Sequence, residues 1–230
     1  MASGERRILA IGGVQLSPGS TDWPLHQFML DLTGTARPRI CMLATAAGEN
    51  PSGIASFYAT FARAAEPTHL DLFGRTVDDI EGFLLDQDVI YVGGGNTANM
   101  LAIWRVHGLD RALRAAWEAG VVLAGMSAGS ICWFESGTTD SFGPELQPVH
   151  GALGFLPGSN CPHFDSEPGR RPLYHRLVGS GELPDGYAAD DGAALVFAGT
   201  ELREVVSSRP GAAAYRVERQ GDAAVETRLP

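Results

Sequence analysis

The sequence predicts an α/β fold built around a mostly parallel sheet, and two observations support this prediction. Short, almost continuous apolar runs recur along the first half of the chain, as in strands buried on both faces of a sheet. Segments of helical composition separate these runs, and such alternation is typical of parallel strands joined by crossover helices. None of the 230 residues resembles a linker, so we expect a single catalytic domain over residues 1–230.

Each expected element follows from a local pattern. The apolar runs predict strands at residues 7–13, 40–45, 69–73, 88–92 and 121–125. Helical composition predicts helices at residues 52–65, 96–107 and 111–120. Gly, Pro and Ser are frequent in residues 138–162, which indicates loops with short strands, and we expect closing strands at residues 193–196 and 213–217.

Composition restricts the partners of the protein. The formal net charge is -10, with 27 acidic residues against 17 basic ones, which argues against a nucleic-acid partner. The 3 cysteines form no CxxC pair, so neither a disulfide framework nor a metal site is expected. The chain shows no signal peptide and no apolar run long enough for a membrane span, which predicts a cytoplasmic protein without a membrane partner.

The segment Gly125-Met126-Ser127-Ala128-Gly129 has the pattern of a nucleophile elbow. It follows the expected strand at 121–125 and precedes a helical stretch at 130–134, as a strained strand-turn-helix serine requires. The small neighbours permit the tight turn, and the start of a helix favours developing negative charge. The alternative is an ordinary turn in which Ser127 only caps the helix.

A serine nucleophile also needs oxyanion donors and a base. The backbone N–H of Ala128 follows the nucleophile, and Gly95, in the triple glycine after the strand at 88–92, is the expected second donor. The triple glycine could also be a plain turn, and it lacks the spacing of a phosphate-binding loop. His163, stiffened by the preceding proline, is the preferred base, although spacing alone leaves His150 open.

Three motifs together resemble the peptidase E (aspartyl dipeptidase) family, to which cyanophycinases are related. They are VGGGNT at residues 92–97, GMSAGS at 125–130 and PHF at 162–164, in the order of that family. The resemblance implies a three-layer sandwich like that of class I glutamine amidotransferases, a serine in place of the cysteine nucleophile, and no metal or organic cofactor. It also implies that Ser127 is the nucleophile, that His163 is the base, and that Gly95 and Ala128 form the oxyanion hole.

The third member of the catalytic triad and the substrate-binding residues follow from weaker sequence patterns. Either Glu135 or Asp140 is expected to complete the catalytic triad; Glu135 is preferred because it follows two aromatic residues and should therefore lie near apolar side chains. Family members cleave peptides that begin with Asp, so Arg170 and Arg171 are expected to bind the substrate carboxylate, unless they are solvated surface charges. Asp190 and Asp191 stand where relatives in the family carry an acidic residue, and Asp191 is the expected partner of the substrate amine, unless the two are ordinary loop acids.

These residues predict a serine-type dipeptidase that hydrolyses Asp-X dipeptides through an acyl-enzyme on Ser127. One alternative is a cyanophycinase-like β-aspartyl isopeptidase. Another is a catalytically idle, amidotransferase-like binding module. A carboxylesterase with the α/β-hydrolase fold is disfavoured, because its base normally lies near the chain end and no histidine follows His175. The expected partner is a small peptide, and the protein is expected to be a monomer or a homodimer.

Overall fold

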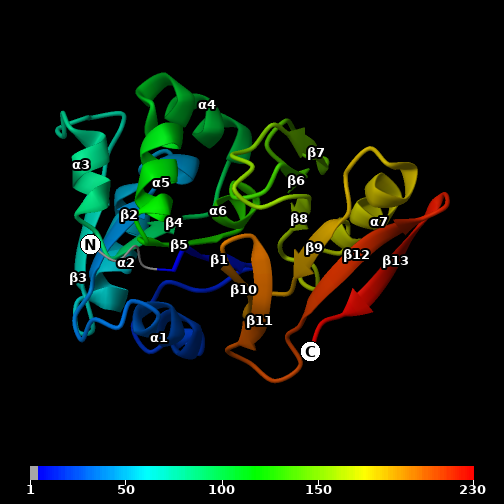
Figure 1. The fold of residues 1–230 in the computed structure, drawn as a ribbon, viewed down its shortest axis with the longest axis horizontal. Helices are drawn as coiled ribbons and strands as arrows, with labels where there is room; N and C mark the ends of the chain where they lie inside the picture. Colours follow the sequence, from blue (N-terminus) through cyan, green and yellow to red (C-terminus); the bar gives the residue numbers. More distant parts are fainter. Residues whose placement is uncertain (1–4) are drawn as a thin grey trace.

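The computed structural model describes residues 5–230, which form two sheets lying next to each other (Figure 1). The strands of the first sheet are β1 (Arg7–Ile11), β2 (Arg39–Leu43), β3 (Glu66–Leu70), β4 (Val89–Val92), β5 (Val122–Met126), β10 (Ala193–Ala198) and β11 (Glu201–Ser207). Their order across the sheet is β11-β10-β1-β5-β4-β2-β3. The five strands from β1 to β3 are parallel, and β10 and β11 add an antiparallel edge. The predicted α/β class is confirmed.

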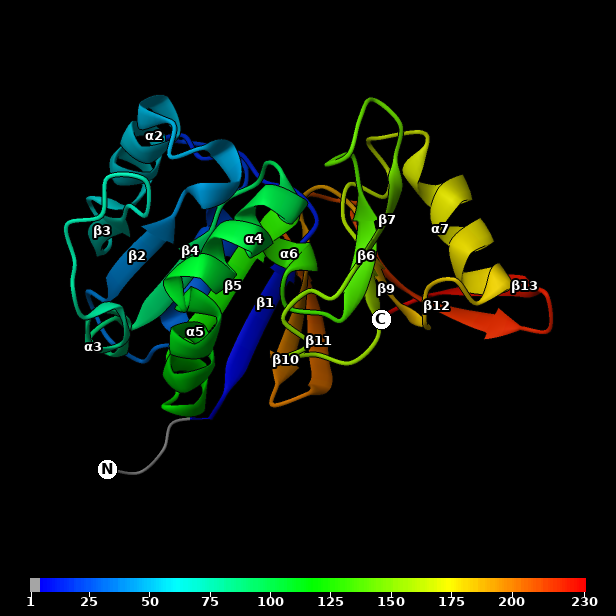
Figure 2. The ribbon, with the colours of Figure 1, turned by 90° about the horizontal axis from the view of Figure 1, so that it is seen from above.

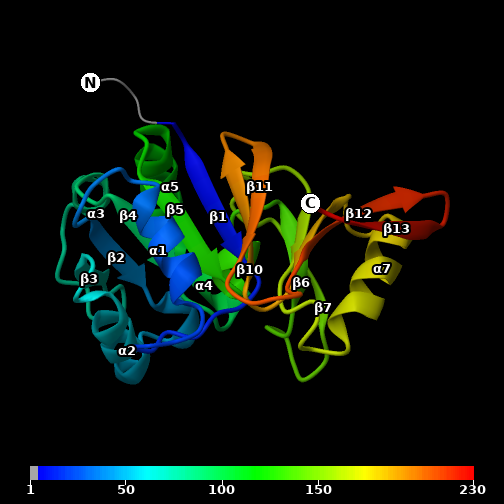
Figure 3. The ribbon, with the colours of Figure 1, turned by 90° about the horizontal axis from the view of Figure 1, so that it is seen from below.

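Helices cover both faces of this sheet. One face carries α1 (Trp23–Asp31) and α2 (Pro51–Phe61), and α1 is seen in front of the strands in Figure 3. The other carries α3 (Ile80–Leu85), α4 (Thr97–His107) and α5 (Leu109–Glu118); α4 and α5 lie in front of the strands in Figure 2. A short 3-10 turn, η1 (Thr45–Ala47), follows β2.

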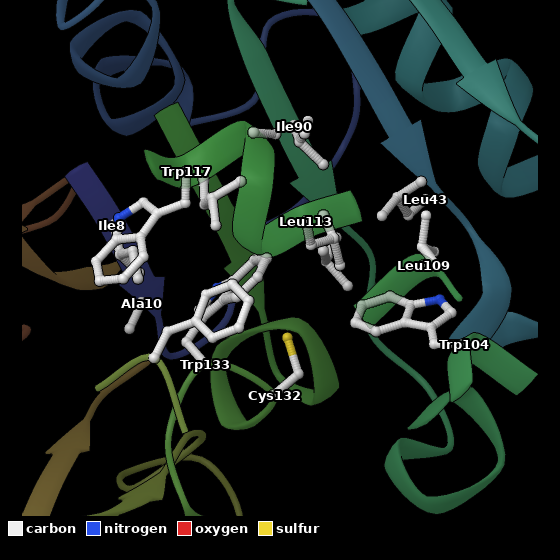
Figure 4. Packing of buried hydrophobic residues seen from close by; sticks show 14 of the residues in the cluster. Ile8, Ala10, Leu43, Ile90, Trp104, Leu109, Leu113, Trp117, Cys132 and Trp133 are labelled. Atoms are coloured by element: carbon white, nitrogen blue, oxygen red, sulfur yellow. The ribbon is translucent and has the colours of Figure 1, made fainter. Parts of the chain in front are cut away.

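Side chains along the buried strands point alternately to the two faces of the first sheet, which explains why helices cover both faces. Ile8 and Ala10 of β1 pack in the same cluster as Trp117 of α5, as Figure 4 shows. Their neighbours Leu9 and Ile11 point to the other face and pack in the cluster that contains α1 and α2. Because successive strand side chains point to opposite faces, an apolar run that is buried throughout must be covered on both sides.

A second sheet follows the elbow, and the short strands expected within residues 138–162 belong to it. Its strands are β6 (Ser136–Thr139), β7 (Gln147–His150), β8 (Ser159–Cys161), β9 (Gly186–Ala189), β12 (Ala214–Gln220) and β13 (Ala223–Arg228), in the order β13-β12-β9-β8-β6-β7. The helix α7 (Arg170–Ser180) packs on this sheet. The strand expected at 213–217 therefore belongs to the second sheet and does not close the first one. Several of these strands are short or partly exposed, so they lack the apolar runs that mark the first sheet.

The two sheets meet through the short helix α6 (Ala128–Ile131), which contacts β1 and β5 of the first sheet and β6 and β8 of the second. Aromatic side chains fill the junction: Phe134 lies 5.8 Å from Phe197 of β10 and 6.2 Å from Tyr187 of β9, measured between ring centroids. The segment that follows the elbow is thus buried between the sheets. Within residues 5–230, no helix has both the length and the apolar character that a membrane crossing would require.

Candidate active site

Ser127 occupies a sharp turn between β5 and α6. Its backbone has φ 56° and ψ -116°, an unfavourable conformation for a residue with a side chain. Both flanking glycines are required by close packing: a Cβ on Gly125 would lie 2.4 Å from the Gly129 carbonyl oxygen, and one on Gly129 would lie 2.3 Å from the Val92 oxygen. The sequence pattern thus encodes a strained elbow that presents the serine at the end of the strand.

The side chain of Ser127 borders a cavity of about 280 Å³. The other residues that line it are Gly95, Asn96, Asp140, Glu167 and Arg170. Among the described residues the Ser127 hydroxyl has no hydrogen-bond partner, so it is free to contact a ligand in the cavity. Sequence reasoning did not single out Glu167, which lines the same cavity and accepts a hydrogen bond from Arg170.

Two backbone N–H groups belong to residues next to Ser127: Gly95 lines the same cavity, and Ala128 follows Ser127 in the chain. Gly95 has φ 136° and packs against η1, where a Cβ would lie 2.3 Å from the Ala46 oxygen. Its N–H has no acceptor among the described residues. Ala128 is the first residue of α6, a position at which the backbone N–H has no intrahelical acceptor. Both groups are therefore available to an oxygen atom bound beside Ser127.

His163 lies in the loop that follows β8, with φ 53°. Its ring packs against Gly13, just beyond the end of β1; a Cβ on Gly13 would lie 2.7 Å from the His163 Cε1. Ser127 is at the same edge, because its N–H donates to the Ile11 oxygen of β1 at 3.3 Å. The C-terminal ends of the neighbouring parallel strands β1 and β5 thus place the two residues at the same edge of the sheet, where His163 and Ser127 line separate cavities. His150, in contrast, is exposed on β7.

The carboxylate that contacts His163 belongs to Asp191. Its Oδ1 lies 2.7 Å from His163 Nδ1. Because an ionised carboxylate can only accept, His163 carries its proton on Nδ1 in this pair and leaves Nε2 as the basic nitrogen. The hydrogen bond from His163 is the main reason that the pKa of Asp191 lies below its usual value, against the opposing effect of partial burial.

This contact corrects the expectation that Glu135 or Asp140 orients His163. Glu135 is exposed; its carboxylate accepts the Gly158 N–H at 2.9 Å and borders a different cavity, between the two sheets. Asp140 borders the Ser127 cavity but makes no hydrogen bond to His163 among the described residues. The sequence cue for Asp191 was its place before the strand at 193–196, which pairs antiparallel with β1 and so begins near Gly13, against which His163 packs.

The side chains of Arg170 and Arg171 point in different directions, because successive residues of a helix such as α7 are rotated by about 100°. Arg170 is 3% exposed and borders the Ser127 cavity; its Nε donates to Glu167 at 2.7 Å and its Nη1 to the Thr138 oxygen at 2.9 Å. Arg171 leaves the cavity and pairs with Glu226 of β13. Of the two arginines expected to bind the substrate, only Arg170 lines the Ser127 cavity.

Within residues 5–230, no three His, Cys, Asp or Glu side chains cluster in a way that could hold a metal ion. The three cysteines are free and buried.

Comparison with known proteins places this geometry in a family. The model of peptidase family S51 matches residues 8–205. A relative named "Uncharacterized peptidase YgaJ" from Bacillus subtilis is 49% identical over 226 residues, which cover 98% of this chain and 97% of the relative. A Shewanella denitrificans protein named "Peptidase E" is 33% identical over 90 residues, or 39% of this chain and 38% of that one.

Two solved structures share the fold. The crystal structure of a peptidase from an acI-B1 Actinobacterium has a TM-score of 0.72 at 19% identity and covers 100% of this chain and 96% of its own. A putative peptidase E protein from Listeria monocytogenes has a TM-score of 0.66 at 19% identity, covering 89% of this chain and 99% of its own. The family model and the relative of nearly equal length establish that the chain belongs to peptidase family S51, a family of serine peptidases.

Proposed function

We propose that this S51 peptidase hydrolyses short peptides that begin with Asp through an acyl-enzyme on Ser127. The observation that carries the proposal is the 2.7 Å contact between His163 and Asp191, together with the strained turn that presents Ser127 at the same edge of the first sheet. A weakly nucleophilic hydroxyl needs a base, and that base needs a carboxylate to hold its tautomer. Asp191 takes this role in the proposal, in place of Glu135 or Asp140.

The proposed reaction has two halves. His163 Nε2 removes the Ser127 proton as Ser127 Oγ attacks the first peptide carbonyl, and the imidazolium then protonates the departing amine. The N–H groups of Gly95 and Ala128 donate to the oxyanion of each tetrahedral intermediate. In the second half, His163 Nε2 removes a proton from a water molecule as that water attacks the acyl carbon. The tetrahedral intermediate then breaks its bond to Ser127 Oγ, which takes the proton back from the imidazolium, and free aspartate is released.

The charges around the cavity support a substrate with a free N-terminal Asp. Arg170 uses Nε and Nη1 within the protein, and its Nη2 has no hydrogen bond among the described residues, so this nitrogen can meet the substrate carboxylate. Asp140 and Glu167 supply negative charge for the substrate ammonium. An N-acetylated peptide would place a neutral group beside these carboxylates and should bind less well.

One observation also favours a second candidate function, cleavage of β-aspartyl-arginine links. The cavity holds two carboxylates against a single guanidinium, so a cationic side chain could also pair there. The two functions share Ser127, His163 and Asp191 and differ only in the substrate bond. A direct comparison of substrates separates them.

The test is hydrolysis of Asp-Leu, Glu-Leu, Ala-Leu, Asp-p-nitroanilide, N-acetyl-Asp-p-nitroanilide and β-Asp-Arg by the wild type and by Ser127→Ala. We expect cleavage of the two free Asp substrates, at least tenfold slower cleavage of the acetylated one, and a loss of about 10⁴ to 10⁶ in rate in Ser127→Ala. Cleavage of β-Asp-Arg alone would support the second function. A merely tenfold loss in Ser127→Ala would refute the mechanism. No cleavage, together with no labelling of Ser127 by a fluorophosphonate, would indicate an idle binding module.

A further inference from the structure

Two side chains outside the Ser127 cavity hold the backbone of Asp191. Its N–H donates to Asp165 Oδ1 at 2.8 Å, and its carbonyl accepts a hydrogen bond from Arg209 Nε at 2.6 Å. Arg209 Nη2 also donates to Asp165 Oδ2 at 2.6 Å, which closes a ring of hydrogen bonds. We propose that Asp165 and Arg209 are positioning residues that fix the Asp191 carboxylate against His163; the inference rests on the proposed hydrolysis.

Asp165 connects the loop that carries His163 to the loop that carries Asp191. It stands two residues after His163, so a single carboxylate joins the loop of the base to the loop of Asp191. The neighbouring Phe164 N–H donates to the Ala189 oxygen at 3.1 Å, which ties the same two segments at a second point. A displacement of Asp165 would therefore change the separation of Asp191 and His163.

Arg209 reaches Asp191 from the connection between β11 and β12, a distant part of the sequence. Gly192 permits the approach: its φ is 77°, and a Cβ there would lie only 3.0 Å from Arg209 Cγ and Nε. The preceding residue, Ser208, donates its N–H to the Gly192 oxygen at 2.8 Å and its hydroxyl to Asp22 Oδ1 at 2.6 Å. Arg209 thus projects from an anchored turn and can hold the Asp191 backbone in place together with Asp165; we call Asp165 and Arg209 the clamp.

The alternative is a surface ion pair with no role in the reaction. The two side chains are 45% and 35% exposed, and pairs with such exposure contribute little to stability. Their opposite charges cancel, so the clamp adds no net charge beside Asp191. Its effect should therefore be geometric: it should appear in kcat, because the orientation of the base matters in the transition state, and hardly in KM or Tm.

The experiment compares Arg209→Ala and Asp165→Asn with the wild type. We expect kcat to fall by roughly 30- to 100-fold, KM to stay within about threefold, and Tm to stay within about 3 °C. Arg209→Lys should recover only part of the loss, because an ammonium cannot replace the planar fork that contacts both Asp165 and the Asp191 carbonyl. Arg203→Ala is the matched control, since Arg203 forms an exposed pair with Glu201 at 3.4 Å on β11, and it should retain full kcat.

A double-mutant cycle decides whether the clamp acts through Asp191. In the Asp191→Ala background, Arg209→Ala should reduce kcat by less than about threefold; an undiminished loss there would overturn the inference. The rate of Ser127 labelling by a fluorophosphonate is measured in parallel and depends on no peptide. Labelling of the wild type and Arg209→Ala at equal rates would refute the clamp alone. A wild type that is not labelled would refute the proposed mechanism, and the clamp with it.

Discussion

A buried histidine predicts that this protein loses stability in mild acid. His26 of α1 is completely buried, and neither of its ring nitrogens has a hydrogen-bond partner among the described residues. Its ring packs edge-on against Phe61 at 5.3 Å and Trp23 at 6.3 Å between centroids. Burial lowers the pKa of His26 from 6.5 to about 4, although the nearby Asp22 carboxylate opposes the change.

The size of the effect follows from proton linkage. Between pH 6.5 and pH 4 the unfolded chain binds a proton at His26 that the folded chain does not, so the free energy of unfolding decreases as the pH falls through this window. The stability lost through this group is about 2 kcal/mol at pH 5 and approaches about 3 kcal/mol below pH 4. At pH 7 both states are mostly neutral at His26, and the loss is close to zero.

The assay is urea unfolding of the wild type and His26→Leu at pH 7 and pH 5. Because leucine removes the titration and keeps an apolar side chain of similar size, the stability difference between the two pH values should be about 2 kcal/mol smaller in His26→Leu. His150→Gln is the control, since His150 is exposed on β7, and it should follow the wild type. The reasoning would be refuted if His26→Leu lost as much stability as the wild type on acidification.

Two further predictions concern the site. Asp191→Asn should reduce kcat by about 10³- to 10⁴-fold, because the amide can favour the wrong tautomer of His163, whereas Glu135→Gln should change kcat by less than threefold. Steady-state kinetics at pH 7.5 measures both variants. A larger loss in Glu135→Gln than in Asp191→Asn would restore Glu135 as the partner of His163. Gly95→Ala should reduce kcat by about 10²- to 10³-fold, because a Cβ would collide with the Ala46 oxygen and turn the Gly95 N–H away from the oxyanion. Circular dichroism should show an intact fold. A fully active variant would exclude the Gly95 N–H as an oxyanion donor.

The first sheet was predictable because its strands are buried on both faces. Runs such as 88–92 and 121–125 are apolar at nearly every position, and the structure places β4 and β5 there. The second sheet was not predictable in this way. Its strand β8 has only three residues, Ser159–Cys161, and their polar groups are satisfied by contacts such as Ser130 with Asn160 at 2.9 Å. No local pattern in the sequence reveals partners that lie thirty residues away.

The same distinction applies to the site. Ser127 could be located because the elbow is a local motif: the strand, the turn and the helix are contiguous, and each leaves its own residues in the sequence. The carboxylate beside His163 could not be located by proximity to the elbow. Phe134 is buried between the sheets, and the chain then enters β6, which turns Glu135 toward a cavity away from His163. Asp191 arrives instead through the pairing of β10 with β1, a contact between distant segments.

The position of the site at the junction of the sheets explains why distant contacts decide its geometry. Ser127 follows a strand of the first sheet, and His163 follows β8 of the second, so no single sheet fixes their separation. Asp191 connects the two sheets: it pairs with Gly13 beyond the end of β1 and accepts a hydrogen bond from His163 Nδ1. Small changes in the relative positions of these side chains should matter, because a misplacement of about 1 Å can cost roughly 100-fold in rate. The two side chains that hold the Asp191 peptide therefore stand where the fold most needs an added constraint.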